Sequence, residues 1–210
     1  LAPTMTPAEN SKKYFDKYGK LKRTEEALTE QIADTRSEIE HLESVSNALD
    51  IALAESDLAQ IKEELMEYGY IKKHYDRRKG QKAQSKSKPF HYVTEDGYDI
   101  YVGKNNFQND ELTFKFATGN DWWFHAKGTA GSHVIVKTEG KELPDRTFEE
   151  AAALAAWYSK AKDQAKAEID YIERKHIKKP NGSKPGFVVY YTNYSMTIVP
   201  DISGLKEIED

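Results

Sequence analysis

The stretch DWWFHAKGTAGSHVIVK, residues 121–137, decides the fold because it holds two strand-like runs around a glycine-bracketed turn. Its two tryptophans are adjacent, so in a strand their side chains must point to opposite faces of the sheet. One indole can then anchor the core while the other presents a flat ring and an N–H donor. Histidines, a carboxylate and the turn surround them, and this mixture suits contact with an anionic, planar ligand. We therefore treat the stretch as the candidate site.

Short β-like runs continue on both sides of this stretch. FHYVT and YDIYVG, which flank Asp96-Gly97 within residues 90–103, predict a hairpin. Residues 110–117 predict a short helix, and WWFHA and HVIVK predict a second strand pair around the turn at 128–131. Asparagines directly after the first hairpin either cap the next helix or read base edges.

The C-terminal third predicts one helix and three more strands. Residues 147–161 predict the helix, with Thr147 as N-cap and Glu150 completing a capping box. The strands are expected at 167–177, 186–192 and 195–200, the last two joined across Asn193-Tyr194. Residues 90–210 therefore predict an α+β domain: a mostly antiparallel sheet with one helix packed on a face.

A heptad pattern dominates the first quarter of the chain. From Pro7 to about Ala54, apolar residues recur every seven positions in two seams offset by three and four residues, which is the spacing of a coiled coil. The seams are 21, 28, 35, 42, 49 and 18, 25, 32, 39, 46, 53. At 1.5 Å per residue this predicts an arm of roughly 70 Å that begins after Thr6 as N-cap. A shorter helix is expected at 57–68, capped by Ser56 or Asp57 and closed by Gly69.

A narrow apolar stripe of this kind needs a partner helix, and the helix at 57–68 is too short to cover it. We expect either a segment outside this sequence or a second copy of the chain, so a homodimer of this chain through residues 14–53 is predicted. The sequence does not begin with methionine, and we read it as a piece of something longer.

Composition and charge limit the function classes. The 210 residues contain no cysteine, which excludes a disulfide scaffold and thiolate metal sites and fits a reducing, cytoplasmic location. No apolar run approaches the ~20 residues that cross a bilayer, so no membrane partner is expected. The net charge is −4, but residues 76–89 carry six basic side chains against one acidic. The sequence thus predicts a coiled-coil region at 1–75, a flexible basic linker at 76–89 and the α+β domain at 90–210.

Three chemistries compete for the central motif. Asp121, His125 and His133 could form a metal site for a metal-dependent enzyme, and Ser132 could serve as a nucleophile. No HExxH, nucleophile-elbow or P-loop pattern accompanies them. We therefore expect no enzyme, no cofactor and no metal, with the histidines satisfied inside the fold and Ser132 a turn residue.

RNA contact is the third chemistry and the one we favour. Stacking rings, amide side chains and lysine-bearing loops such as KHIKKPNGSKPG (175–186) form a set typical of RNA-binding surfaces. The predicted nucleic-acid-binding residues are Lys104, Asn105, Asn106, Asp121, Trp122, Trp123, His125, Ser132, His133, Lys175, His176, Lys178 and Lys179.

The chain resembles a known family in four places: YVGKNNFQND, the D-W-x-x-H…GSHV segment, AAALAAWYSKAK, and KHIKKP followed by KPG. These are similar to the NFACT-R domain of the RqcH and fibronectin-binding-protein-A-like group. The preceding PAENSKKYFDKYGKLKR, with its heptads, and IKEELMEYGYI are similar to the coiled-coil middle region of the same group. The resemblance covers essentially the whole chain.

This resemblance implies a role in ribosome quality control. Such proteins bind obstructed large ribosomal subunits that carry peptidyl-tRNA and extend the stalled chain with alanine. It therefore implies the 50S subunit, through its rRNA, and tRNA as partners. A fibronectin-binding surface adhesin is the alternative that the other family name suggests.

Overall fold

The computed structural model describes residues 1–72 and 87–208 of the chain. They divide into two compact units, residues 1–42 and a second that starts at Glu43. Most of the predicted linker at 76–89 lies outside the described residues. None of the helices in the described ranges is both long and apolar enough to span a membrane.

Helix α1 (Pro7–Ile51) forms where the heptads predict it. Thr6 caps its start: the Glu9 amide donates to Thr6 Oγ1 at 3.3 Å, and the Thr6 amide donates to Glu9 Oε2 at 2.8 Å. These two bonds satisfy backbone groups that the helix itself leaves unpaired. The predicted N-cap is confirmed.

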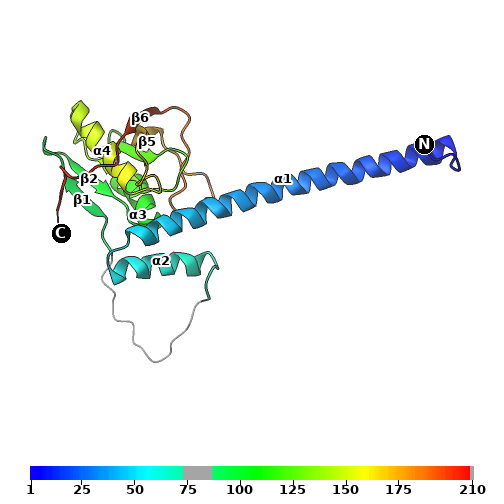
Figure 1. Cartoon of the computed structure of the whole chain (residues 1–210), viewed down its shortest axis with the longest axis horizontal. Coiled ribbons are helices and arrows are strands. Elements are labelled where there is room, and N and C mark those ends of the chain that lie inside the picture. The colour runs from blue at the N-terminus through cyan, green and yellow to red at the C-terminus, as the bar shows by residue number, and fades with distance from the viewer. Residues whose placement is uncertain (73–86, 209–210) are drawn as a thin grey trace, which may run out of the picture. The chain divides into compact units, whose positions relative to one another are not determined.

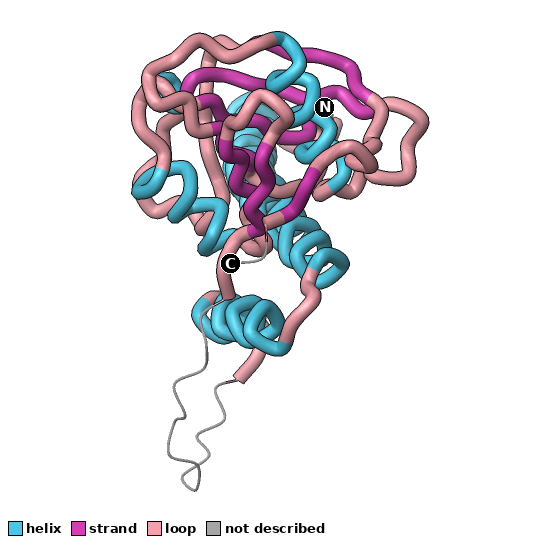
Figure 2. Tube along the Cα trace, turned by 90° about the vertical axis from the view of Figure 1, so that its left-hand side faces the viewer, coloured by secondary structure: helices cyan, strands magenta, loops and turns pink. Residues whose placement is uncertain are grey.

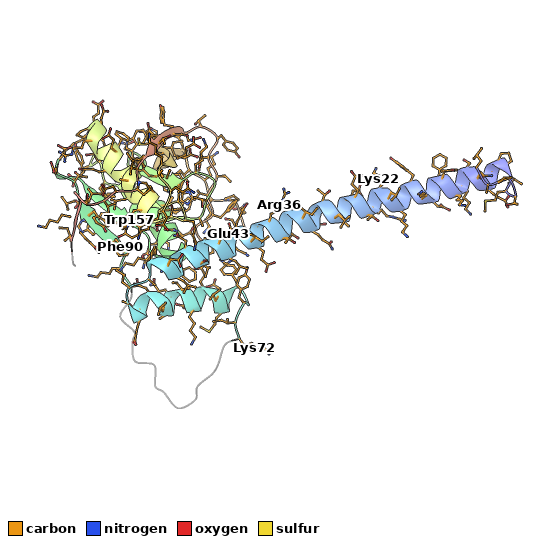
Figure 3. All side chains as sticks on the ribbon, in the orientation of Figure 1. Lys22, Arg36, Glu43, Lys72, Phe90 and Trp157 are labelled. Carbon is orange, nitrogen blue, oxygen red and sulfur yellow. The ribbon has the colours of Figure 1, made fainter. Side chains whose placement is uncertain are left out.

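The heptad stripe of α1 is exposed to solvent. Leu28 and Ile32 are each 51% exposed, and Ile39 is 50% exposed. Figure 3 shows side chains projecting from the helix around Lys22 and Arg36. A stripe of this size calls for a partner, but the structure holds one copy of the chain, so coiled-coil pairing stays a prediction.

Helix α2 (Glu55–Glu67) is the short helix expected at 57–68. It begins two residues earlier, and Ala54, not Ser56 or Asp57, takes the N-cap position. Asp57 lies inside the first turn, where its carboxylate accepts the amides of Leu53 and Ala54, each at 3.0 Å. Gly69 follows the helix with a φ of 79°, as a C-terminal glycine should.

A single seven-stranded sheet fills the second unit, and its strands lie in the order β6-β5-β3-β4-β2-β1-β7. All neighbouring strands pair antiparallel, so the predicted sheet is confirmed. The strands, magenta in Figure 2, are β1 (Phe90–Val93), β2 (Asp99–Val102), β3 (Trp122–Ala126), β4 (Val134–Val136), β5 (Ala167–Glu173), β6 (Tyr194–Ile198) and β7 (Lys206–Glu207). Both predicted strand pairs form, with Val93 opposite Asp99 and Trp123 opposite Ile135.

Helix α4 (Asp145–Trp157) packs on one face of this sheet (Figure 1). Its contact side is rich in alanine, and Ala151, Ala152 and Ala155 are fully buried with Phe124 and Val134 of the sheet. Small side chains let the helix approach the strands closely. The result is the α+β architecture that the sequence predicts.

The start of α4 differs from the prediction. Pro144, not Thr147, takes the N-cap position, because its fixed φ of −65° suits the entry into the helix. Thr147 lies inside the first turn, and its buried hydroxyl has no hydrogen-bond partner among the described residues. Thr147 therefore completes no capping box with Glu150.

A short helix runs directly into a π-helix that covers the opposite face of the sheet. They are α3 (Asn106–Glu111) and η1 (Leu112–Phe116), which place helical backbone where residues 110–117 predict it. Asn105 caps α3, since its Oδ1 accepts the Gln108 amide at 3.0 Å. Leu112 packs there with Trp123 and Ile172.

The prediction of a strand at 186–192 is wrong. In this part of the described chain only an isolated bridge joins Val189 to Lys178, and β5 turns into the 3-10 helix η2 (Arg174–His176) after Glu173. The segment lies over a sheet face instead of extending it, with the Tyr190 ring 5.4 Å from that of Trp123. Strand β6 pairs with β5 in its place.

Enlarging an α4 alanine should separate the helix from the sheet. Ala155→Leu adds three carbons to a fully packed contact and is expected to lower the free energy of unfolding by about 1–3 kcal/mol. Urea unfolding followed by circular dichroism measures this change. Ala165→Leu, at an exposed position, is the matched control. Equal stability of the two variants would contradict the packing described.

Candidate nucleic-acid interface

The adjacent tryptophans lie on opposite faces of the sheet, as the alternation of a strand requires. Trp123 faces η1 and is 1% exposed, whereas Trp122 is half-buried on the α4 side. Trp123 stacks on His125 at 5.6 Å and meets His133 edge-on at 5.2 Å. Of the two indoles, only Trp122 remains within reach of a ligand.

His133 is buried and His125 is half-buried, and the environment of both favours the neutral ring. His133 Nδ1 lies 2.8 Å from Thr113 Oγ1. Burial, together with the neighbouring His125, lowers the pKa of His133 to about 3, and burial lowers the pKa of His125 as well. Because desolvation favours the uncharged form, neither ring supplies positive charge to a polyanion at neutral pH.

Asp121 ties two loops to the start of β3. Its buried carboxylate accepts the amides of Thr118 at 2.7 Å and Thr138 at 3.0 Å, and it pairs with Lys137. Burial raises the pKa of Asp121, but the hydrogen bonds from Lys137 and the two threonines outweigh it and lower the pKa overall. This network assigns Asp121 a structural role.

The metal-site alternative gains no support from this geometry. Within residues 1–72 and 87–208, no three His, Cys, Asp or Glu side chains are placed to hold one ion. Ser132 is 1% exposed, and its amide donates to the Tyr158 carbonyl at 2.9 Å. Because Ser132 is buried, its hydroxyl is not accessible to a substrate.

The asparagine motif after β2 forms an internal junction with α2. Asn106 Nδ2 donates to Glu64 Oε1 and to Ser44 Oγ, each at 2.7 Å. Asn105 Nδ2 donates to Gln60 Oε1, also at 2.7 Å. Both asparagines are buried. Their amides are therefore engaged within the fold, and a base edge would have to displace these bonds.

Two glycines let the backbone approach the side chains of Asn106 and Asn109 closely. A Cβ on Gly103 would lie 2.2 Å from Asn109 Oδ1, and a Cβ on Gly186 would lie 2.6 Å from Asn106 Oδ1. Gly186 also has a φ of 76°, which disfavours any other residue. The KPG of the 175–186 loop is thus fixed against the junction.

Lys104 also turns inward. Its Nζ lies 3.8 Å from Asp57 Oδ1 and 4.3 Å from the centre of the Phe90 ring. A lysine held between a carboxylate and a ring is poorly placed to meet a phosphate.

The segment after β5 carries exposed basic side chains. The side chains of Lys175 and His176 are 48% and 51% exposed, and Lys178 is exposed too. Lys179 is exposed as well and pairs with Asp110. Lys175, His176 and Lys178 form what we call the basic row, which faces solvent together with Lys179.

A cleft that the sequence did not reveal lies beside this row. It has a volume of about 490 Å³, and its lining includes Asn120, Trp122, Lys141, Glu142, Phe148 and Glu173. Glu173 connects the two features, because its Oε2 lies 2.7 Å from Lys175 Nζ and 3.6 Å from His176 Nε2. The alternation at Trp122 was the only sequence signal for this cleft.

Two family models match the chain. One describes NFACT N-terminal and middle domains and covers residues 1–84, and the other describes the NFACT protein RNA binding domain and covers residues 88–191. Curated proteins named Rqc2 homolog RqcH are also similar. That of Streptococcus suis (strain 05ZYH33) is 44% identical over 211 residues, 100% of this chain and 37% of its own length. That of Bacillus subtilis (strain 168) is 41% identical over 206 residues, 96% and 35% respectively.

A solved structure shares the fold. It is the C-terminal part of the fibronectin/fibrinogen-binding protein from Streptococcus suis, with a TM-score of 0.83 and 42% sequence identity. The match covers 95% of this chain and 78% of that one. The chain spans only about a third of the length of the curated relatives above.

Removing the Asn106 side-chain amide should lower the stability of the fold rather than the affinity for RNA. Asn106→Ala deprives the buried Glu64 carboxylate of a donor and is expected to cost about 2–4 kcal/mol in the free energy of unfolding. Urea denaturation measures this cost, with Asn181→Ala at an exposed position as control. A stable variant that has lost RNA affinity would instead assign Asn106 to the ligand.

The buried imidazole of His133 should make the stability of the fold depend on pH. In the unfolded chain His133 has an ordinary pKa near 6.5, so below about pH 6.5 the unfolded chain binds a proton that the folded chain, in which the pKa of His133 is about 3, does not bind. The free energy of unfolding should therefore be greatest above pH 6.5 and fall by up to ~1.4 kcal/mol per pH unit below it. Urea midpoints at pH 7.5, 6.5 and 5.5 test this, with His176→Asn as the exposed control. A flat profile over that range would rule the effect out.

Proposed function

The chain belongs to the NFACT family, and from this membership we propose that it is the RNA-binding portion of a ribosome quality-control factor. The name Rqc2 homolog RqcH on its relatives supports that role. In the intact protein we expect binding to obstructed large subunits that carry peptidyl-tRNA, in support of C-terminal alanine tailing in the cytoplasm. The portion described by these 210 residues would act by binding, without catalysis of its own.

The observation that carries this proposal is the basic row at 175–178. It lies inside the region that matches the RNA-binding family model, and its side chains face solvent at the end of β5. Cations of this kind neutralise phosphates and release counterions, so affinity depends on charge and on salt. The buried members of the predicted set, including Trp123, His133 and both asparagines, would support this surface from inside.

A salt titration tests the proposal. The chain should bind tRNA or a 23S rRNA fragment with an affinity that falls steeply as salt rises. Lys175→Ala with Lys178→Ala should weaken binding irrespective of sequence and reduce the slope of log K against log salt by about 1.4–1.8, if each lysine meets one phosphate.

The control for this titration is Lys162→Ala with Lys166→Ala. Both control lysines are exposed, and replacing them removes the same charge. They precede β5, whose seven residues separate them from the basic row by roughly 23 Å along the strand. Absence of binding at low salt would refute RNA binding. Equal losses in the two double variants would refute the basic row as its location.

Fibronectin binding is the second candidate, because the similar solved structure carries that name. Immobilised fibronectin and immobilised tRNA, offered the same protein at the same salt, separate the two functions. Retention on fibronectin that survives loss of the basic row would favour the adhesin.

We also propose that the exposed stripe of α1 pairs two copies of the chain. The 24.0 kDa chain should sediment as a dimer at high micromolar concentration. Leu28→Glu with Ile32→Glu should shift it to a monomer, because charges in a heptad seam oppose pairing. Ala33→Glu with Ser37→Glu, off the stripe, should leave the dimer intact. A monomeric wild-type chain would contradict this pairing.

A further inference from the structure

The cleft beside the basic row has the size and wall of a ligand site. Its volume of about 490 Å³ lies within the usual range for small-ligand pockets. Trp122 and Phe148 form one wall, with ring centres 4.8 Å apart and planes at 80°. An edge-on partner of this kind fixes the indole while leaving part of its surface to the cleft.

The aromatic wall continues to the edge of the sheet. The Trp122 ring lies 5.8 Å from that of Tyr171 and 6.2 Å from that of Tyr194. Tyr171 and Tyr194 are themselves stacked at 5.5 Å, and Tyr194 is 61% exposed. A row of rings therefore leads from solvent, across β6, β5 and β3, into the cleft.

The polar lining of the cleft selects against phosphate. Three acidic residues, Glu142, Asp145 and Glu173, belong to this lining, whereas Lys141 is its only lysine or arginine among the described lining residues. Carboxylates repel a phosphate, but they accept hydrogen bonds from the amino and imino groups of a nucleobase edge. Basic side chains lie beside the cleft instead, where Lys175 and His176 flank Glu173.

We infer that the cleft takes one unpaired nucleobase of a bound RNA, stacked on Trp122, while the phosphates of the same strand lie along the basic row. This inference rests on the proposed RNA-binding function and adds the element that is read. It requires single-stranded or splayed RNA, because a paired base cannot enter a cleft. A cationic side chain of a protein partner is the competing occupant. The ion pair of Glu173 with Lys175 makes that occupant less favourable, since it already offsets part of the negative charge.

Fluorine NMR on the whole chain tests the inference. Labelling with 5-fluorotryptophan gives one signal for each of the three tryptophans, and Trp122→Phe identifies the signal of Trp122. A single-stranded RNA decamer should shift this signal. A decamer of the same length with abasic riboses keeps every phosphate and should leave the signal in place while binding more weakly.

Affinity gives an independent readout. Trp122→Ala should weaken binding of the intact decamer about 5- to 150-fold, the equivalent of about 1–3 kcal/mol per stacked base. It should leave binding of the abasic decamer unchanged, which a merely unfolded variant would not. Trp157→Ala, at the other end of α4 (Figure 3), is the matched control and should bind the intact decamer normally.

The outcomes separate this inference from the proposed function. If the chain binds neither decamer, the proposed function fails. If it binds both equally, or if Trp122 does not respond to the intact decamer, RNA binding stands and the base cleft is overturned. A Trp122 shift caused by an arginine-rich peptide but not by RNA would assign the cleft to a protein partner instead.

Discussion

The alternation of side chains along β3 is the constraint on which the rest of the second unit depends. Because Trp122 and Trp123 are adjacent in a strand, both faces of the sheet must accommodate an indole. One face does so beneath α4 and the other beneath η1 and the segment that carries Val188 and Tyr190. The cleft exists because the α4 side covers Trp122 incompletely, while Trp123 is sealed. A single local rule thus separates the structural ring from the ring available to a ligand.

The polar motifs near β3 serve mainly to hold that arrangement. Asp121 fixes the loops before and after the β3–β4 pair, and Asn106 fixes α3 to α2 through Glu64. Buried polar groups satisfied in this way specify one arrangement, since any alternative would leave them unpaired. Sequence motifs that suggest ligand chemistry can therefore be the framework of a site whose contacts are made by less distinctive residues.

Local patterns predicted much of the fold, because their causes are local. The Asp96-Gly97 hairpin, the opposite orientation of the two indoles and the cap at Thr6 follow from neighbours within a few residues. The strand expected at 186–192 failed because tertiary contacts with Trp123 and Asn106 hold that segment over a face. The same limit applies to the site. Asn105 and Asn106 donate hydrogen bonds to side chains some forty residues earlier in the chain, and no sequence spacing predicts such contacts. The cleft is lined in part by the loop after β4, which is a tertiary contact as well.

Photo-crosslinking with 4-thiouridine-substituted RNA, followed by mass spectrometry, identifies the residues that touch the RNA. Adducts are expected on peptides that contain Trp122, residues 141–148 or the basic row at 175–178, and none on residues 104–109. Adducts concentrated on 104–109, with the cleft and the basic row unmodified, would contradict this expectation.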